Sequence, residues 1–501
     1  MIRILCILLL LLFIALPATP LQAAPLSLRQ AERMALERNL ELRAATFVSR
    51  ASDALVRKGF GIYDPRLEVL WTEGESRDLS NFQFFTGQTG VDNRRVDFSL
   101  AQTLPTGGEL TASMTNRRDH VFAGDEPFLD PEYDSELKLS LVQPLLQGLG
   151  RTVTEQTILF AIKDREISVQ NLRERGFEIL ARVRDVYFEV QRQREDLRFR
   201  ETSVSLAQKV LEENRARLEA GVLAPVELLE AEVGLKQRER DLLDARRAYQ
   251  DALDELAVLL NEPGPLETAE EPLGVPSLET DEDLGMLQAL EKRPDLQRRA
   301  RQIQRLSLER RIARNRALPR VDLLASYSHK GVGEDYSEDL DRLAEDEIRN
   351  WEVGLTLSYP LGNRDARQDY RRTELQLAGL RAGQEQLRRE ARSEVRTAIR
   401  LLDVSRTKIE VAHRAVELAE EKLRILLRRK EVGLATTRQV LEGEEDLAEA
   451  RTDHTAALTE YNRAVTRYLQ VTGLLLEREG IRLAGPADSE GAGPLLEMYR
   501  P

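Results

Sequence analysis

The side chains that most often catalyse reactions or bind metals are few in this chain of 501 residues. Four histidines are scattered along it without the spacing of metal ligands, and we expect no metal site: His120, His329, His413 and His454. The only cysteine, Cys6, lies in an N-terminal apolar run. The Gly-rich "LPTGG" (104–108) lacks the following helix and lysine of a phosphate-binding loop. Since no nucleophile motif or acid pair stands out either, the sequence predicts neither an enzyme nor a cofactor.

Two similar stretches instead place acidic residues just after a glycine that should end a long helix. They read "EAGVLAPVELLEAE" (219–232) and "KEVGLATTRQVLEGE" (430–444). Acids near the start of a helix are favoured by the helix dipole, and this alone can explain Glu227 and Glu442. Alternatively, carboxylates gathered around an entrance attract cations and repel anions. The residues themselves leave both explanations open.

The N-terminus has the pattern of an export signal. Arg3 precedes an apolar run of 13 residues (4–16), which is short of the roughly 20 that span a bilayer, and small residues follow. We therefore predict a signal peptide at 1–24, with an uncleaved anchor as the alternative. Loss of Arg3 changes the net charge from −13 to −14, which disfavours nucleic acid as a partner. Since no later run could form a transmembrane helix, an exported chain of this kind stays soluble or enters a membrane as β-strands.

The chain reads as two halves with the same order of elements, helix–strands–helix–turn–helix. A shift of 212 residues aligns Gly221 with Gly433. A shift of 254 aligns the first strand segment of one half with the first of the other, and a shift of 216 does the same for the last strand segments. The difference, 254 − 216 = 38 residues, marks an insertion in the first half. The predicted organisation is a first repeat at 25–260, a linker at 261–283, a second repeat at 284–476 and a tail at 477–501.

Hydrophobic spacing separates the helices of each repeat from its strands. Apolar residues at alternating spacings of three and four predict long helices that pack nearly parallel to their neighbours. At 1.5 Å per residue, the two longest would each extend about 100 Å. We place the helices at 151–216, 226–260, 365–431 and 437–476, and the strands within about 64–144 and 319–360.

The strand segments alternate apolar and polar side chains, so each has one apolar and one polar face. The apolar face could cover a soluble core, or it could face lipid around a water-filled lumen. The insertion adds a hairpin at 96–115, which either widens a barrel to six strands per chain or lies outside the membrane. Four aromatic residues near strand ends could form a girdle at the membrane interfaces: Trp71, Tyr327, Trp351 and Tyr359.

Together, these features resemble the TolC-type family of outer-membrane efflux proteins. "LSLRQAERMALERNLELRAA" (26–45) is similar to the first helix of that family, and "VQPLLQGLGR" (142–151) to its junction between strand and long helix. The stretches around Gly221 and Gly433 resemble its two periplasmic helix turns. The resemblance covers essentially the whole chain after the predicted signal peptide.

The resemblance implies an α+β membrane protein in which a trimeric outer-membrane β-barrel joins a long periplasmic α-helical barrel. Such a protein is the exit duct of a tripartite efflux or type I secretion system in a Gram-negative bacterium, and it needs no catalytic group. Its implied partners are two further copies of the chain, outer-membrane lipid, a periplasmic adaptor of the membrane-fusion type and an inner-membrane pump of the RND, ABC or MFS class. A soluble periplasmic coiled-coil adaptor or scaffold is the alternative, although adaptors lack two repeated strand blocks.

The resemblance also implies roles for residues at the two turns. The acidic gating positions of the family fall on Glu227, Gln439 and Glu442, so two of the three are acidic here. Lys430 stands where the family has a gating tyrosine, and we expect it to pair with Glu227 or Glu442. The exposed turn residues are the expected contacts of the adaptor: Gly221, Val222, Leu223, Gly433, Leu434 and Ala435.

Overall fold

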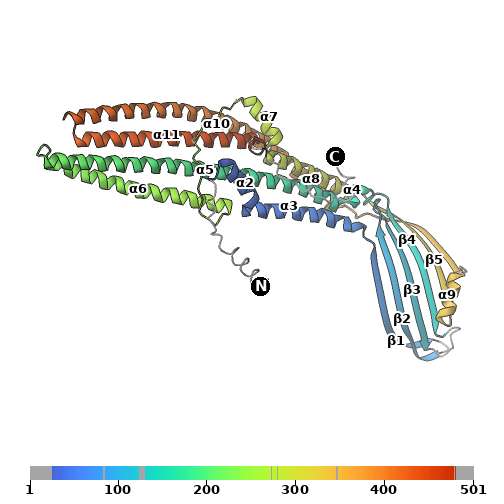
Figure 1. The fold of residues 1–501 in the computed structure, drawn as a ribbon. Helices are drawn as coiled ribbons and strands as arrows, with labels where there is room; N and C mark the ends of the chain where they lie inside the picture. Colours follow the sequence, from blue (N-terminus) through green and yellow to red (C-terminus); the bar gives the residue numbers. More distant parts are fainter. Residues whose placement is uncertain are drawn as a thin grey trace, which may run out of the picture. The chain divides into compact units, whose positions relative to one another are not determined.

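The computed structural model describes residues 25–82, 85–122, 130–271, 273–278, 280–345, 348–478 and 480. The predicted signal peptide at 1–24 lies outside the described residues, and so do residues 479–501 apart from residue 480. The described chain divides into two compact units (Figure 1). The first unit contains residues 25–47, 171–297 and 387–480, and the second contains residues 48–170 and 298–386. Each unit therefore combines segments from both halves of the sequence.

Long helices follow the same order in each half (Figure 1). α5 (Gln156–Glu219) and α10 (Arg364–Glu431) have 64 and 68 residues, and each is followed by a helix of 36 residues, α6 (Pro225–Leu260) or α11 (Thr437–Thr472). This repeated order confirms the predicted internal duplication. No helix in the described part of the chain combines the length and apolarity needed to cross a bilayer. The shorter helices are α2 (Leu28–Arg38), α3 (Leu40–Gly59), η1 (Phe60–Tyr63), α4 (Arg151–Thr154), α7 (Glu282–Lys292), α8 (Pro294–Arg316), α9 (Tyr336–Ala344) and α12 (Leu475–Arg478).

The second unit contains one antiparallel sheet whose six strands lie in the order of the sequence. The strands are β1 (Arg66–Phe82), β2 (Phe85–Thr103), β3 (Glu109–Phe122), β4 (Glu132–Pro144), β5 (Arg320–Gly333) and β6 (Ile348–Ser358). The inserted hairpin expected at 96–115 belongs to β2 and β3, which pair with β1 and β4. The insertion therefore adds two strands to the sheet itself.

Helix α9, between β5 and β6, was not predicted from the sequence. Asp335 caps it by accepting hydrogen bonds from the backbone N–H groups of Ser337 and Glu338. The buried Asp339 accepts a hydrogen bond from the backbone N–H of Ser135 at 3.0 Å and a second one from the Ser135 hydroxyl. These contacts hold α9 against β4 and β5.

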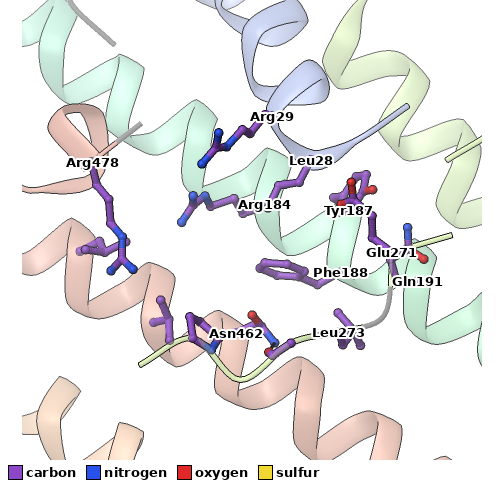
Figure 2. Close-up of a pocket in the computed structure, with 14 residues that line it drawn as sticks. Leu28, Arg29, Arg184, Tyr187, Phe188, Gln191, Glu271, Leu273, Asn462 and Arg478 are labelled. Carbon is purple, nitrogen blue, oxygen red and sulfur yellow. Dashed lines mark hydrogen bonds between the residues drawn. The ribbon is translucent and has the colours of Figure 1, made fainter. Parts of the chain in front are cut away.

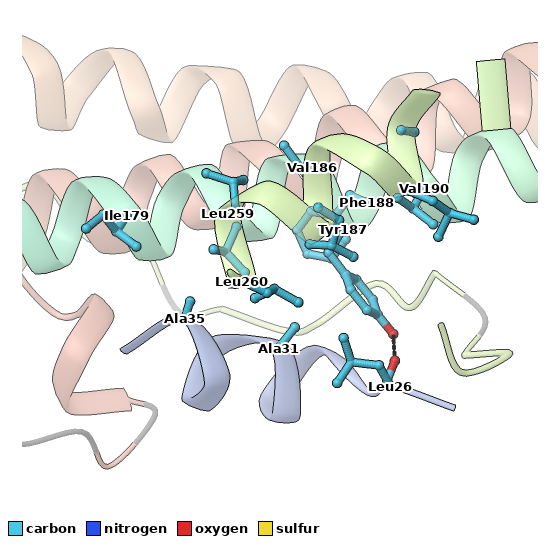
Figure 3. Packing of buried hydrophobic residues seen from close by; sticks show 14 of the residues in the cluster. Leu26, Ala31, Ala35, Ile179, Val186, Tyr187, Phe188, Val190, Leu259 and Leu260 are labelled. Carbon is cyan, nitrogen blue, oxygen red and sulfur yellow. Dashed lines mark hydrogen bonds between the residues drawn. The ribbon is translucent and has the colours of Figure 1, made fainter. Parts of the chain in front are cut away.

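The first unit has a core between α2, α5 and α6 (Figure 3). Ala31 and Ala35 are buried in this core, where α2 packs close to α6, and Leu260 lies in it at the end of α6. Tyr187 is almost fully buried there, and its hydroxyl donates to the backbone carbonyl of Leu26 at 3.1 Å (Figure 3). A buried tyrosine of this kind needs a partner for its hydroxyl, and the chain before α2 supplies it.

The predicted linker is fixed to the first unit by side chains of two long helices. Gln191 of α5 donates to the backbone carbonyl of Ala269 at 2.9 Å. Asn462 of α11 donates to that of Gly274 at 3.0 Å, and the Tyr461 hydroxyl donates to that of Pro276 at 2.8 Å. The segment between α6 and α7 is thus a structural part of the first unit.

Candidate functional site

The two long hairpins, α5–α6 and α10–α11, turn with the same backbone geometry. Gly221 and Gly433 have φ angles of +73° and +79°, which strain any residue with a Cβ. The residue after each glycine closes the turn with a backbone hydrogen bond. The N–H of Val222 donates to the carbonyl of Arg217 at 3.0 Å, and the N–H of Leu434 donates to that of Arg429 at 2.7 Å. Pro225 then starts α6, whereas Thr436 caps α11. These turns place the ends of four helices from the first unit next to one another.

Side chains from all four helices meet in a buried polar group beside the turns. Asn214 of α5 donates from Nδ2 to the Thr437 hydroxyl of α11 at 2.9 Å, and to the backbone carbonyl of Glu227 on α6 at 3.3 Å. The Thr437 hydroxyl donates in turn to Glu227 Oε2 at 3.2 Å. Lys430 of α10 completes the group, because its ammonium interacts electrostatically with Glu227. We term Asn214, Glu227, Lys430 and Thr437 the tip cluster.

Lys430 is 6% exposed, and its ammonium has no hydrogen-bond partner among the described residues. The expected pairing with Glu227 or Glu442 is therefore not formed. Burial lowers the pKa of Lys430, an effect that Glu213 and Glu227 oppose and Arg217 reinforces. The buried Oδ1 of Asn214 also lacks a partner within the described chain. Buried polar groups without hydrogen bonds cost about 1–3 kcal/mol each, so this arrangement of the tip cluster is only marginally favourable.

The other two residues with predicted gating roles lie outside the tip cluster. Gln439 accepts a hydrogen bond from the backbone N–H of Thr436 at 3.0 Å, while the Thr436 hydroxyl accepts one from that of Gln439 at 3.3 Å. Gln439 thus forms a capping box at the start of its own helix. Glu442 is exposed and accepts from Arg438 at 3.1 Å. Exposed pairs of this kind contribute little to stability, so the carboxylate of Glu442 stays available to solvent and ions.

A buried ion pair that the sequence did not indicate also joins the hairpins. Arg238 of α6 donates to Glu444 of α11 at 2.7 Å, and their side chains are only 11% and 8% exposed. Arg238 also donates to the backbone carbonyl of Leu441 at 3.0 Å. Removing one partner would leave a buried charge uncompensated, so this pair fixes the register between α6 and α11.

The predicted adaptor contacts lie at the exposed ends of both hairpins. Val222 and Leu434 directly follow the two turn glycines and are 74% and 66% exposed. Leu223 and Ala435, one residue further on, are half-buried. Matched apolar side chains that project from both turns offer a small surface on which another protein can dock.

The register of the six strands brings a row of apolar residues together on one face of the sheet. Residues that pair from strand to strand form rows across the whole sheet. One such row is apolar: Leu67, Leu100, Ala112, Leu139, Tyr327 and Trp351. The adjacent row lies on the opposite face and is polar throughout: Glu68, Ser99, Ser113, Lys138, Ser328 and Asn350. An exposed apolar face of this extent indicates contact with lipid or with another protein.

Three of the four predicted interface aromatics share this apolar face. Trp71, Tyr327 and Trp351 are 62%, 43% and 77% exposed, although Trp351 and Tyr327 lie opposite each other on neighbouring strands. Tyr359 follows the end of β6, and its hydroxyl accepts a hydrogen bond from Arg367 at 3.4 Å. Tyr327 lies in the middle of β5 rather than at an end, and a girdle at the membrane interfaces stays a prediction.

A pocket of about 310 Å³ lies between α2, α5, α11 and the linker (Figure 2). Phe188 provides apolar surface, and three arginines line the pocket: Arg29, Arg184 and Arg478. Arg184 forms a buried ion pair with Glu32 at 2.5 Å. In the part of the chain that the structure describes, no group of three or more His, Cys, Asp or Glu side chains is placed to hold a metal ion. The pocket thus combines the apolar surface of Phe188 with the charges of three arginines and Glu271.

The hairpin turns, the apolar sheet face and the duplicated order of elements agree with one family of proteins. The family model for the outer membrane efflux protein matches residues 133–262 and 286–474, more than half of the chain. The chain belongs to the outer membrane efflux protein family. No curated protein matches the chain significantly.

Solved structures of outer-membrane channels share the fold of this outer membrane efflux protein. The channel protein CusC is 16% identical with a TM-score of 0.65, over 89% of this chain and 92% of CusC. The CmeC outer membrane channel of Campylobacter jejuni is 13% identical with a TM-score of 0.65, over 91% and 90% of the two chains. The MtrE outer membrane channel of Neisseria gonorrhoeae, solved in its open state, is 18% identical with a TM-score of 0.62, over 89% of each chain.

Membership in the outer membrane efflux protein family confirms the function and location predicted from the sequence. The chain is an outer-membrane channel with a large periplasmic part and serves as the exit duct of a tripartite export system. Its partners are further copies of the chain, a periplasmic adaptor and an inner-membrane pump. The alternative of a soluble periplasmic adaptor is wrong, because the family model that matches both halves is that of the outer-membrane component.

Proposed function

We propose that the two turns form the periplasmic entrance of the exit duct and that the tip cluster holds this entrance closed. The observation that carries the proposal is the hydrogen-bonded link from Asn214 through Thr437 to Glu227, which joins the two hairpins beside their turns. A wide passage requires hairpins to move apart, which breaks this link. Buried hydrogen bonds contribute about 0.5–1.5 kcal/mol each, so a few of them suffice for a gate that still opens.

Lys430 opposes the closed arrangement. Its buried ammonium has no hydrogen bond to any residue that the structure describes, and movement of the hairpins would restore its contact with water. The closed and open states are then close in free energy, and a partner that binds one of them better can shift the balance. Val222 and Leu434 are suitable contacts for the adaptor, because they lie on the same helix turns that must move.

Acidic residues at the entrance favour the passage of cations. Glu227 lies within the tip cluster, and Glu442 is exposed on the same helix as Thr437. In a trimer each carboxylate occurs three times around one axis, which concentrates negative potential. Gln439 adds no charge and serves the cap of α11, so the ring of carboxylates consists of Glu227 and Glu442.

Replacing Thr437 by valine tests the gate, since valine keeps the shape of the side chain and removes both of its hydrogen bonds. We expect purified Thr437→Val trimers in planar bilayers to open several-fold more often than the wild type, as a loss of about 1–2 kcal/mol implies. Thr407→Val is the matched control, because the Thr407 hydroxyl donates to the carbonyl of Asp403 within the exposed part of α10. Equal opening of the two variants would contradict the gating role of the tip cluster.

A further inference from the structure

Two of the four histidines lie side by side on the second hairpin. His413 of α10 and His454 of α11 have ring centres 5.4 Å apart, with ring planes inclined by 46°. They are separated by 41 residues in the sequence, which is why their spacing indicated no ligand pair. The antiparallel packing of α10 and α11 brings them together.

The separation of the two rings fits a shared metal ion. Metal–nitrogen bonds of about 2.0–2.1 Å place the ring centres of two imidazoles about 5 Å apart on one tetrahedral ion. The observed separation of 5.4 Å is close to this value. Each histidine also comes from a separate long helix, so an ion held by both would link α10 to α11.

The backbone around the pair is braced on both sides. Lys408 of α10 donates to Glu460 of α11 at 2.8 Å on one side of the histidines. Arg451 of α11 donates to Glu420 of α10 at 2.8 Å on the other side. These pairs show that α10 and α11 lie side by side on both sides of the histidines, so the helix packing itself brings the two imidazoles together.

The two imidazoles are placed to accept an ion. Imidazole nitrogen is a common ligand of borderline metals, and each ring supplies one. His413 is exposed, so an ion can reach it from solvent. Its Nε2 lies 3.6 Å from Glu417 Oε1, which adds negative charge beside the pair.

We propose that His413 and His454 form a two-histidine site for a divalent cation of borderline softness, such as Zn²⁺, Ni²⁺ or Cu²⁺. The site lies about 27 Å from the α10–α11 turn, counted along the helix. No third protein ligand is in place among the described residues, so water fills the remaining positions and the ion exchanges readily. Cu²⁺ should bind most tightly, following the general order for nitrogen ligands. Bound metal would stiffen the second hairpin independently of the tip cluster.

Binding is tested on the full-length trimer in mild detergent, after any histidine tag has been removed. We expect one Zn²⁺ or Cu²⁺ per chain at pH 7.5, a rise in melting temperature that a chelator reverses, and nitrogen hyperfine structure in the Cu²⁺ paramagnetic resonance spectrum. His413→Asn and His454→Asn should each lower the affinity more than about tenfold. His120→Asn is the control, because His120 Nδ1 pairs with Asp130 in the second unit.

The double variant His413→Asn/His454→Asn makes the outcome unambiguous. Its fold is checked by its trimer band and by its melting temperature without metal. If it binds Zn²⁺ as tightly as the wild type, or if the wild type binds no more ions than the double variant, the site does not exist. If affinity is lost in the double variant and kept in His120→Asn, the site is established, whatever the Thr437→Val experiment shows about the gate.

Discussion

Lys430 carries its charge at a position that water does not reach in the closed tip. Methionine fills a similar volume without the buried ammonium, so we expect Lys430→Met to stabilise the closed arrangement by about 1–3 kcal/mol. The measurement is the open probability in planar bilayers, which should fall several-fold. Lys422→Met, on the same helix, is the control, because Lys422 is 57% exposed and pairs with Asp446 at the surface. If both variants open like the wild type, burial of the ammonium does not influence the gate.

The same lysine predicts how opening depends on pH. Burial lowers the pKa of Lys430 in the closed tip, so an open tip with a hydrated ammonium binds more protons. The closed state therefore gains stability as pH rises from the lowered pKa towards the ordinary value of 10.5, and loses it as pH falls through that range. We expect open probability to decrease with rising pH in the wild type and to change less in Lys430→Met. An unchanged profile in the variant would assign the effect to a neighbour such as Glu213 or Glu227.

Glu442 tests the electrostatic part of the proposal. Its exposed carboxylate lies near the proposed entrance, so Glu442→Ala should reduce the preference of the channel for cations. The reversal potential in a salt gradient should move towards zero, most clearly at low ionic strength, where charges are least screened. Asp244→Ala is the control, since Asp244 is an exposed acid on α6 about 25 Å from Glu227 along the helix. Unchanged selectivity in Glu442→Ala would leave this residue with only its surface pair to Arg438.

At the scale of elements, α10 carries an apolar stripe without a partner in the described chain. Its members recur every seven residues and are between 48% and 65% exposed: Val404, Val411, Leu418 and Ile425. A heptad stripe of this kind packs against another helix, which in a trimer belongs to the next copy. We expect Leu418→Lys to prevent trimer formation on mild-detergent gels. Glu410→Lys is the control, because it places a lysine on the same helix outside the stripe and changes the charge by even more, two units instead of one. Trimers of both variants would show that the stripe is not an interface.

The sequence predicted the elements whose pattern is local. Gly221 and Gly433 end their helices where expected, because a positive φ favours glycine regardless of tertiary packing. The capping role of Gln439 was also readable, since Thr-x-x-Gln is a capping-box pattern. By contrast, β2 begins at Phe85 rather than near residue 96, because polar residues on both faces erase the alternation there. The tip cluster depends on contacts such as Asn214 with Thr437, 223 residues apart, which no local pattern specifies.

At the scale of the molecule, the six-stranded sheet bears on how the channel closes in the membrane. β1 and β6 are its edge strands, and backbone groups at an edge cannot remain unpaired in lipid. In a trimer, the β1 edge of one copy can pair with the β6 edge of the next. Three sheets of six strands would then form a barrel of eighteen strands. Barrels of about that size enclose an aqueous channel, so we infer that the inserted hairpin widens the pore.

Engineered cysteines test this closure directly, since the only native cysteine, Cys6, lies in the predicted signal peptide. A cysteine at Leu70 on β1 is combined in turn with one at Asn350, Glu352 or Thr356, which lie on the same face of β6. We expect oxidation to produce covalent trimers in one register, because a disulfide requires Cβ atoms about 3.5–4.5 Å apart.

Ser113 provides the control for these cross-links, because it lies on the central strand β3 and cannot reach another copy if the edges pair. The combination of Leu70→Cys with Ser113→Cys should therefore give monomers on denaturing gels. If Leu70→Cys forms no cross-link along β6 while trimers persist under mild conditions, the edges of neighbouring sheets do not meet. Closure of one barrel through β1 and β6 would then be wrong, and so would the inferred widening of the pore.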